Sequence, residues 1–188
     1  MKRLLALALI STAFSIASYA QKLMPVGNTI SFTSKQMGVN VEGSFKKFDA
    51  QLAFDPQKPE AGKVGFTIDL TSVDIGDAGT MTELKKPGWF DSARVPTATF
   101  ASTGIKATGP GKFEIAGNLT VKGIAKPVTV PVTLTQAGLP AGQTRADGSF
   151  VIKRLEYKIG DGDWNDVSLV ANDVNVKLRL VFTGIAAL

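Results

Sequence analysis

Apolar and polar residues alternate with a period of two through most of this chain, and this pattern restricts its fold more than any other feature. In the segment 63–70, for example, Val64, Phe66, Ile68 and Leu70 alternate with polar residues or glycine. Successive side chains of a β-strand point to opposite faces of the sheet, so the pattern predicts strands with one apolar and one polar face. Gly, Pro and Asp residues separate these segments about every 8–12 residues, which is typical of an all-β sandwich or barrel.

We expect about eight strands in a single antiparallel sheet, because an antiparallel sheet that is wetted on one side gives this alternation. Closing the sheet into a barrel removes its exposed edges, and about eight strands enclose a space that is filled by side chains or holds one small ligand. A two-sheet sandwich would show the same periodicity, so the alternation alone leaves both architectures open. The expected strands are 28–34, 39–46, 63–70, 97–107, 112–121, 128–136, 148–158 and 174–182, with a short further segment at 51–54.

Prolines and turn residues set the expected limits of several strands. Asp49 and Ala50 have the pattern of a tight turn, and Gly123 and Pro127 would frame another. Pro131 lies inside an expected strand, and because proline cannot donate a ladder hydrogen bond, it indicates a sheet edge or a bulge.

A short helix is expected near residues 81–86. Thr80 and Glu83 have the spacing of a capping box, and Pro87-Gly88 would end the helix.

The segment 84–103 is the one long interruption between the strands, and it carries Trp89 and Phe90 between two prolines. A loop with two such aromatic side chains in a β protein either plugs an open core or forms the lip of a ligand pocket.

Residues 1–20 have the parts of a secretory signal peptide. A basic start is followed by an apolar run at 4–16 that is too short to span a membrane comfortably, and small residues precede a cleavage site after Ala20. We therefore expect one exported domain at 21–188, without stable membrane insertion after cleavage. The chain has no cysteine, so the exported protein must be stable without disulfides, which favours a bacterial periplasm.

The residue types that are missing exclude several classes of chemistry. Without histidine and cysteine, the chain cannot contain a Ser-His-Asp or Cys-His nucleophile, and zinc, copper and haem sites lose their usual ligands. No motif brings two carboxylates together for acid–base catalysis. The net charge of +5 includes no basic cluster, which argues against nucleic-acid binding. We therefore expect a protein that is not an enzyme, holds no metal and binds no nucleic acid.

Five short motifs are spread along the chain after residue 20: Val41–Phe48, Ile68–Asp74, Trp89–Asp91 with Pro96–Ser102, Gly117–Gly123 and Lys126–Pro131. In this order they resemble the YceI-like family. The resemblance implies a periplasmic protein with a lipocalin-like antiparallel β-barrel and a short helical insertion, which favours the barrel over the sandwich. It also implies a non-enzymatic function, because members of the family are not known as enzymes and some hold a polyisoprenoid chain inside the barrel.

Residues 76–85 depart from the family's commoner pattern, in which an Arg-Asp pair and a His precede the Leu. The chain is similar to a subgroup with a Gly-Asp-Ala start, here at Gly76, and a Trp-Phe-Asp ending, here at Asp91. Because the family's helix lies near the mouth of the barrel, this departure bears on which ligand the barrel admits.

The apolar positions of the alternating segments, together with the two aromatic residues of the interruption, are the candidate ligand-lining residues. Each of them alone could be an ordinary core residue. Under the resemblance, the set would line a tunnel for an apolar chain such as an isoprenoid lipid or quinone. The candidates are Val41, Phe45, Phe66, Ile68, Trp89, Phe90, Phe113, Ile115, Val128, Val130, Phe150 and Ile152.

The polar residues that could belong to a site also have purely structural interpretations. Arg94 and Arg154 would each form a surface salt bridge or contact a charged head group. Asp91 and Ser92 are expected to cap or turn the segment that follows them. The run 161–166 resembles the start of a calcium loop but lacks the required glycine at its sixth position, so we expect a polar turn.

The sequence leaves more than one function open. The first is a periplasmic protein that sequesters or transports a long apolar ligand, as a monomer or as a homodimer. The second is a stress-related or interaction protein whose own side chains fill the barrel. The third, an enzyme on the same scaffold, requires titratable groups that converge in the cavity, whereas the expected inward positions are nearly all apolar.

Overall fold

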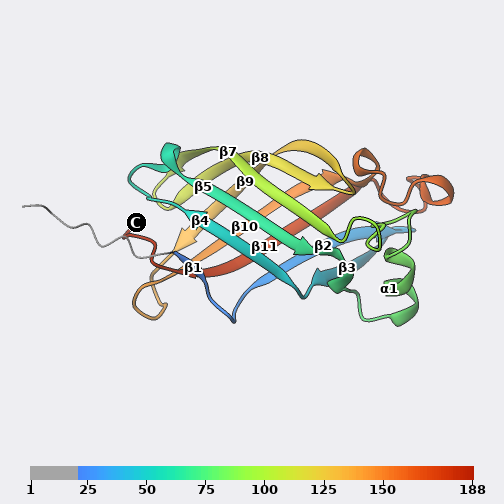
Figure 1. The fold of residues 1–188 in the computed structure, drawn as a ribbon, viewed down its shortest axis with the longest axis horizontal. Coiled ribbons are helices and arrows are strands. Elements are labelled where there is room, and N and C mark those ends of the chain that lie inside the picture. Colours follow the sequence, from blue (N-terminus) through green and yellow to red (C-terminus); the bar gives the residue numbers. More distant parts are fainter. Residues whose placement is uncertain (1–20) are drawn as a thin grey trace, which may run out of the picture.

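An eleven-stranded antiparallel sheet, curled around one interior, makes up most of the computed structural model, which describes residues 21–188 (Figure 1). The strand order is β4-β5-β7-β8-β9-β10-β11-β2-β3-β6, and β1 pairs with β11 outside this path. The all-β fold class and the lipocalin-like antiparallel barrel are therefore confirmed. The strands are β1 (Lys22–Leu23), β2 (Thr29–Gln36), β3 (Val39–Phe45), β4 (Phe48–Ala53), β5 (Lys63–Asp69), β6 (Val73–Asp74), β7 (Thr97–Gly109), β8 (Lys112–Val121), β9 (Ile124–Thr135), β10 (Gln143–Lys153) and β11 (Asp173–Thr183).

The strand count exceeds the expected eight because β1 and β6 have two residues each, too few for an alternation to be visible. The predicted signal peptide, residues 1–20, lies outside the described residues.

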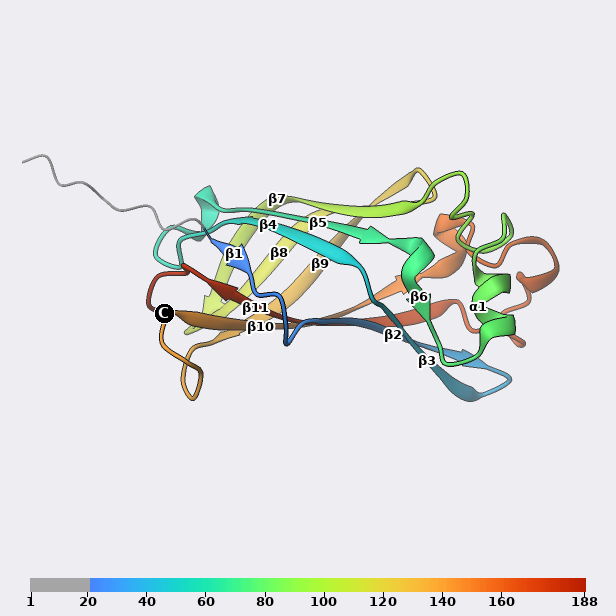
Figure 2. The ribbon, with the colours of Figure 1, turned by 60° about the horizontal axis from the view of Figure 1, so that its bottom comes forward.

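The sheet forms two walls, which Figure 2 shows: β4, β5 and β7 lie opposite β10, β11, β2 and β3. The ladder of hydrogen bonds does not close among the described strands, because its path runs from β4 to β6. The chain itself crosses the opening, since β3 leads through Lys46-Lys47 into β4. At the other end of β4, the side-chain amide of Gln21 bonds both backbone groups of Phe54, accepting from its N–H at 2.8 Å and donating to its carbonyl oxygen. The side chain of Gln21 thus satisfies the two backbone groups of Phe54 in the way that a neighbouring strand would.

Two predicted turns are wrong in position. Asp49 and Ala50 lie within β4, paired with Thr67 and Phe66, and the turn is at Lys46-Lys47. Pro127 lies within β9 rather than at a turn.

The β8–β9 turn is the two-residue Lys122-Gly123, with φ of +51° and +75°. In such a hairpin the residues at Pro127 and Pro131 direct their backbone nitrogens away from β8. On that side, β9 pairs with β10 only through residues 132–135. Both prolines therefore lie on an edge where no ladder N–H is required, which confirms the expectation of an edge at Pro131.

The sheet also departs from the expected limits at β10. This strand ends at Lys153 and is followed by a 3₁₀ helix over Arg154–Tyr157, whereas the alternation suggested a strand over 148–158. Lys158, with φ of +54°, ends that helix and turns the chain.

The one α-helix of the described chain, α1 (Ala78–Leu84), precedes the interruption as predicted but starts earlier. Its N-cap is Asp77, whose carboxylate oxygen Oδ1 accepts from the Thr80 N–H and from the Thr80 hydroxyl, both at 2.7 Å. The capping box predicted at Thr80 is therefore wrong, because the Thr80 hydroxyl donates to Asp77 instead of capping a later N–H. The same hydrogen bonds lower the pKa of Asp77. Among residues 21–188, no helix is long and apolar enough to cross a bilayer.

Candidate functional site: an apolar cavity at the helical end of the barrel

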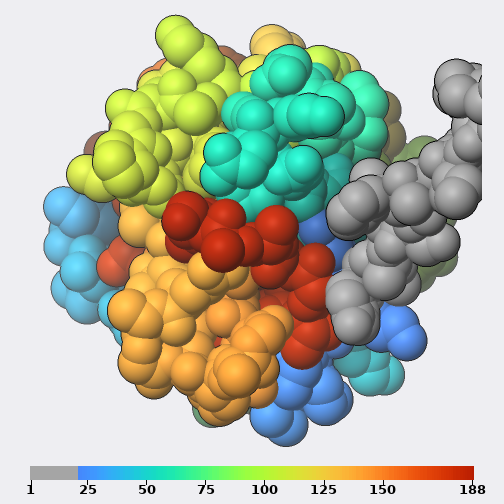
Figure 3. Space-filling model, turned by 90° about the vertical axis from the view of Figure 1, so that its left-hand side faces the viewer, coloured from blue at the N-terminus to red at the C-terminus, as the bar shows by residue number. Residues whose placement is uncertain are grey.

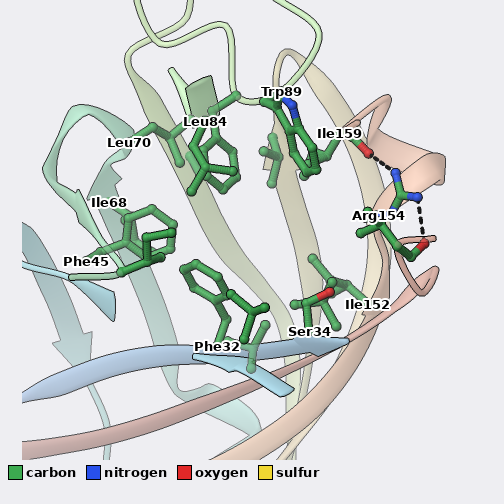
Figure 4. Close-up of a pocket in the computed structure, with 18 of the residues that line it drawn as sticks. Phe32, Ser34, Phe45, Ile68, Leu70, Leu84, Trp89, Ile152, Arg154 and Ile159 are labelled. Atoms are coloured by element: carbon green, nitrogen blue, oxygen red, sulfur yellow. Dashed lines mark hydrogen bonds between the residues drawn. The ribbon is translucent and has the colours of Figure 1, made fainter. Parts of the chain in front are cut away.

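An apolar cavity of about 420 Å³ lies inside the barrel at the end that carries α1 (Figure 4). Its walls come from both sides of the barrel: Ile30, Phe32 and Ser34 on β2, Val41 and Phe45 on β3, Ile68 on β5, Leu119 and Val121 on β8, Phe150 and Ile152 on β10, and Val174 and Val176 on β11. The α1 helix and the segments 84–90 and 154–170 complete it. Three lining residues are exposed, Gln36, Gly79 and Thr80, and they mark the mouth between the end of β2 and α1.

A second apolar cavity of about 90 Å³ lies deeper in the barrel. The two cavities adjoin, because both are lined by Ile30, Ile68, Leu119, Phe150 and Val176. Phenylalanine rings fill much of the deeper region, including an edge-to-face pair of Phe54 and Phe113 with centroids 5.1 Å apart.

The far end of the barrel is covered by the last described residues, which lie across it in Figure 3. Ile185 is buried there and lines the deeper cavity. The side chain of Gln136 holds this segment by donating to the carbonyl oxygen of Ala186 at 2.9 Å. Because one end is covered in this way, the exposed lining residues near α1 mark the way in.

Most of the predicted lining residues are brought together by the fold, although contact with a ligand remains a prediction for all of them. Ile68 and Phe150 line both cavities, and Val128 lines neither. Val41, Phe45, Trp89, Phe90 and Ile152 line the larger cavity, and Phe66, Phe113, Ile115 and Val130 line the smaller one.

The neighbours of Val128 explain its absence from the lining. Val128 pairs with Gly117 on β8. The ring of Phe100 occupies the space over Gly117, where a Cβ would lie 2.4 Å from Phe100 Cζ. The ring therefore fills the interior beside Val128.

Sequence reasoning missed part of the wall. The alternation of 174–182 had already placed Val174 and Val176 on an apolar face, so the signal for β11 was present. The contributions of Ile159, Trp164 and Val170 carried no such signal, because they come from a loop without periodicity.

Arg154 is the largest correction, since it is neither a surface residue nor part of a salt bridge. Its side chain is 1% exposed, and all five of its N–H donors bind backbone carbonyl oxygens. These belong to Ala171 at 3.1 Å, Ile159 at 2.9 Å, Gly160 at 2.6 Å, Trp164 at 2.6 Å and Val170 at 2.7 Å. Burial lowers the pKa of Arg154. The guanidinium thus folds the 154–171 segment into a cavity wall and has no donor left for a head group.

The aromatic interruption forms part of the same wall. Trp89 and Phe90 both line the larger cavity, and the Phe90 ring meets that of Phe45 edge-on with centroids 5.8 Å apart. Trp89 lies beside Trp164, with ring centroids 5.8 Å apart.

Backbone and side-chain bonds tie this interruption to its neighbours. The Gly160 N–H donates to the Gly88 carbonyl oxygen at 2.7 Å. The ammonium of Lys122 donates to the carbonyl oxygens of Pro87 at 2.8 Å and Lys158 at 2.5 Å. Burial lowers the pKa of Lys122. Three loops are therefore joined at this end of the barrel.

Asp91 and Arg94, which follow Trp89 and Phe90, have structural roles: Asp91 turns the chain and Arg94 forms an ion pair. The Asp91 carbonyl oxygen accepts from the N–H groups of Arg94 and Val95, so Asp91 turns the chain. Arg94, whose side chain is exposed, forms an ion pair at 2.7 Å with the buried carboxylate of Asp91.

Two carboxylates at this end of the barrel already have partners. Glu83, at the mouth, is paired with Lys86 at 2.5 Å. Asp166 accepts from the Ser168 N–H at 2.8 Å, which makes its loop a polar turn. Within the described part of the chain, no group of three or more Asp, Glu, His or Cys side chains is placed to hold a metal ion.

The family model for the YceI-like domain matches residues 22–182. A UPF0312 protein from Ectopseudomonas mendocina is 33% identical over 156 residues, which cover 81% of this chain and 82% of that protein. The chain therefore belongs to the YceI-like family.

Solved structures show the same fold. BcnA from Burkholderia cenocepacia is 44% identical, with a TM-score of 0.78 over 82% of this chain and 95% of BcnA. A polyisoprenoid binding domain from Saccharophagus degradans, implicated in plant cell wall breakdown, has a TM-score of 0.70 at 17% identity, over 87% of this chain and 98% of that domain. At that identity, the second similarity concerns the fold alone.

Proposed function

We propose that this protein binds a long apolar molecule of the isoprenoid class, such as a prenyl lipid or quinone, and shields it from water inside the barrel. The observation that carries the proposal is the pair of adjoining apolar cavities, about 420 and 90 Å³, that run inward from the helical end. Burying one CH₂ group contributes about 0.8 kcal/mol, so a chain of several isoprene units would bind tightly without a polar contact. The description of the Saccharophagus degradans domain as polyisoprenoid binding supports this ligand class.

The proposed mechanism is sequestration rather than chemistry. Trp89 and Phe90 would contact the ligand in the outer cavity, and the hydrogen bonds of Arg154 would keep the adjoining part of the same wall in place. Exported by a signal peptide at 1–20, the domain would carry or store its ligand in the periplasm. No catalytic role is proposed, because the charged lining groups Glu83 and Arg154 are already paired or fully hydrogen-bonded.

A cavity-filling pair of variants tests this proposal. Val41 lines the cavity, whereas its neighbour Asn40 is exposed and absent from the lining. Val41→Trp should reduce the affinity for a prenyl lipid presented in cyclodextrin by about tenfold or more, while Asn40→Trp should leave it within about twofold. Equal affinity of the two variants would contradict the assignment of this cavity as the binding site.

A second candidate is a ligandless interaction or stress-related protein, which the ring-filled inner cavity of about 90 Å³ favours. It predicts that no prenyl lipid or quinone binds the purified protein at any concentration tested. Native mass spectrometry of the same sample would also count the subunits and so test the proposed homodimer.

A further inference from the structure

Four aliphatic side chains are exposed at the helical end of the barrel, on two neighbouring tips. Met37 lies in the β2–β3 turn and Val39 is the first residue of β3, and they are 69% and 68% exposed. Val167 and Leu169 belong to the loop before β11, and they are 56% and 37% exposed. We call these four residues the apolar tip. Contiguous exposed apolar side chains on a soluble domain mark contact surfaces more often than isolated ones do.

Backbone hydrogen bonds hold the two parts of the apolar tip side by side. The Met37 N–H donates to the Leu169 carbonyl oxygen at 2.8 Å, and Gln36 forms a β-bridge with Val170. Val39 is opposite Gln36 in the β2–β3 ladder. The apolar tip is therefore a fixed surface and not two independent loops.

The identity of Met37 is not explained by its backbone. Met37 and Gly38 have φ of +49° and +81°, the conformation of a type I′ turn, in which Asn, Asp or Gly is usual at the first position. The equivalent position of the β8–β9 turn holds a lysine, Lys122, which makes hydrogen bonds. Met37 instead directs an apolar side chain into solvent, at a position where a polar residue would fit the turn better.

The apolar tip adjoins the mouth of the cavity. Gln36, an exposed lining residue, precedes Met37 in the chain and faces Val39 across the ladder. Val170, another lining residue, follows Leu169. In Figures 1 and 2 the β2–β3 turn, α1 and the loop before β11 all lie at the same end of the barrel. An apolar molecule could therefore pass from a surface that covers the tip into the cavity without crossing water.

We propose that the apolar tip docks the cavity mouth reversibly onto the surface of a lipid bilayer, and this inference rests on the proposed function. A bilayer fits better than a protein, because stable protein interfaces use about 20–30 residues a side and this tip has four. A neutral bilayer fits better than an anionic one. Lys35 precedes the tip in the chain, but Asp163 and Asp166 lie on the same loop as Val167, so the charges next to the tip are not net positive and electrostatic attraction to anionic lipids is not expected.

The test uses the purified protein and large unilamellar vesicles of phosphatidylcholine. The tip variant is Met37→Asn with Val39→Thr, because asparagine suits the turn and threonine suits a strand, so the fold is retained. The control is Val26→Thr with Val151→Thr, which changes two other exposed valines outside the tip. Co-sedimentation should show that the vesicle partition coefficient falls about tenfold in the tip variant and by less than about twofold in the control, with little dependence on salt.

A second readout separates docking from binding. The tip variant should take up a prenyl lipid from these vesicles about tenfold more slowly, and should keep its affinity for the same lipid presented in cyclodextrin. Equal vesicle partition of tip variant and wild type would overturn the inference. A dimer that the tip variant dissociates, or binding that requires anionic lipid and is lost in salt, would also overturn it. If the lipid binds from neither source, the proposed function fails, while the vesicle partition still reports on docking.

Discussion

Arg154 and Gly160 lie so close together that the guanidinium occupies the space a side chain at residue 160 would need. Arg154 Nη1 donates to the Gly160 carbonyl oxygen at 2.6 Å, and a Cβ on Gly160 would lie 2.5 Å from the same nitrogen and 3.1 Å from Trp89 Cζ3. Gly160 also has φ of +66°, a region that residues with a Cβ rarely adopt. The wall that joins Arg154 to Trp89 therefore depends on a glycine at this position.

Gly160→Ala should reduce the free energy of unfolding by about 2–4 kcal/mol, from left-handed backbone strain and overpacking together. Gly162 is the matched control, because its φ is +70° but nothing lies within 4 Å of its Cβ position. Gly162→Ala should cost only about 1 kcal/mol. Urea denaturation of both variants measures the difference, and equal losses would show that the contact with Arg154 is not restrictive.

Arg154→Lys should destabilise the protein by about 3–5 kcal/mol, because lysine has three donors for five buried carbonyl oxygens and cannot match their positions. Arg94→Lys, at a side chain that is 75% exposed, should change stability by less than about 1 kcal/mol. The denaturant midpoints of the two variants, compared at constant m-value, test both stability predictions. A loss for Arg154→Lys no larger than that for Arg94→Lys would refute the role of Arg154 as the organiser of the wall.

Trp89→Ala should weaken ligand retention more than it weakens folding, because Trp89 lines the cavity and is only partly buried. The measurements are the dissociation rate of a prenyl lipid and the melting temperature of the ligand-free variant. A collapse in melting temperature with unchanged retention would mean that the aromatic segment is a plug for the core. Trp164 fluorescence provides the signal in this variant, because it is then the only tryptophan.

Phe66→Ala should enlarge the deeper cavity and shift the preference toward longer isoprenoid chains. Phe66 lines only that cavity and is tilted against Phe100, with centroids 6.2 Å apart. Its removal should cost about 3 kcal/mol of stability, at the lower end of Phe→Ala substitutions because the side chain is not fully buried. Competition between prenyl chains of two lengths, with Thr67→Ala on the outer face as control, measures the shift. An unchanged preference would place the end of the ligand short of this cavity.

Stability should fall at high pH because of Tyr157. Burial, with a smaller effect from the charge of Glu156, raises the pKa of Tyr157 to about 12. In the unfolded chain a tyrosine titrates near pH 10, so above about pH 10 the unfolded state releases the proton that the folded state retains. The contribution of Tyr157 to the free energy of unfolding is therefore unchanged below about pH 10. Between about pH 10 and 12 the free energy of unfolding falls by about 2–3 kcal/mol.

Tyr157→Phe isolates this effect. The Tyr157 hydroxyl has no hydrogen-bond partner among residues 21–188, so the variant should be at least as stable as wild type at pH 7. Its advantage should grow between pH 10 and 12, and effects of other groups, such as Lys122, cancel in the comparison. Parallel stability curves of the two proteins across this range would contradict the raised pKa.

The alternation of apolar residues was sufficient to predict most of the longer strands and much of the cavity wall. β8 runs over the predicted residues 112–121, because its alternation is uninterrupted and glycine turns flank it. The periodicity also placed Phe45, Ile68 and Phe150 on inward faces, where the structure has them. Barrel and sandwich could not be separated by period, because both give strands with one apolar face, and the family motifs decided between them.

The remaining features depend on contacts between distant residues. Arg154 is a charged residue after an alternating strand, and only the fold shows that carbonyl groups of residues 159–171 surround it. Val128 follows the inward period, yet it does not line either cavity, because the Phe100 ring over Gly117 fills the space beside it. Local periodicity carries no information about either contact.

The mass of the intact protein, isolated from its bacterial source without denaturation, tests the central proposal most directly. Under native conditions, we predict a species heavier than the chain after residue 20 by the mass of one isoprenoid lipid or quinone, lost on denaturation. In Val41→Trp that species should be depleted, and in Asn40→Trp it should persist. A wild-type protein that is consistently empty, and that stays empty when incubated with prenyl lipids and quinones, would contradict the account.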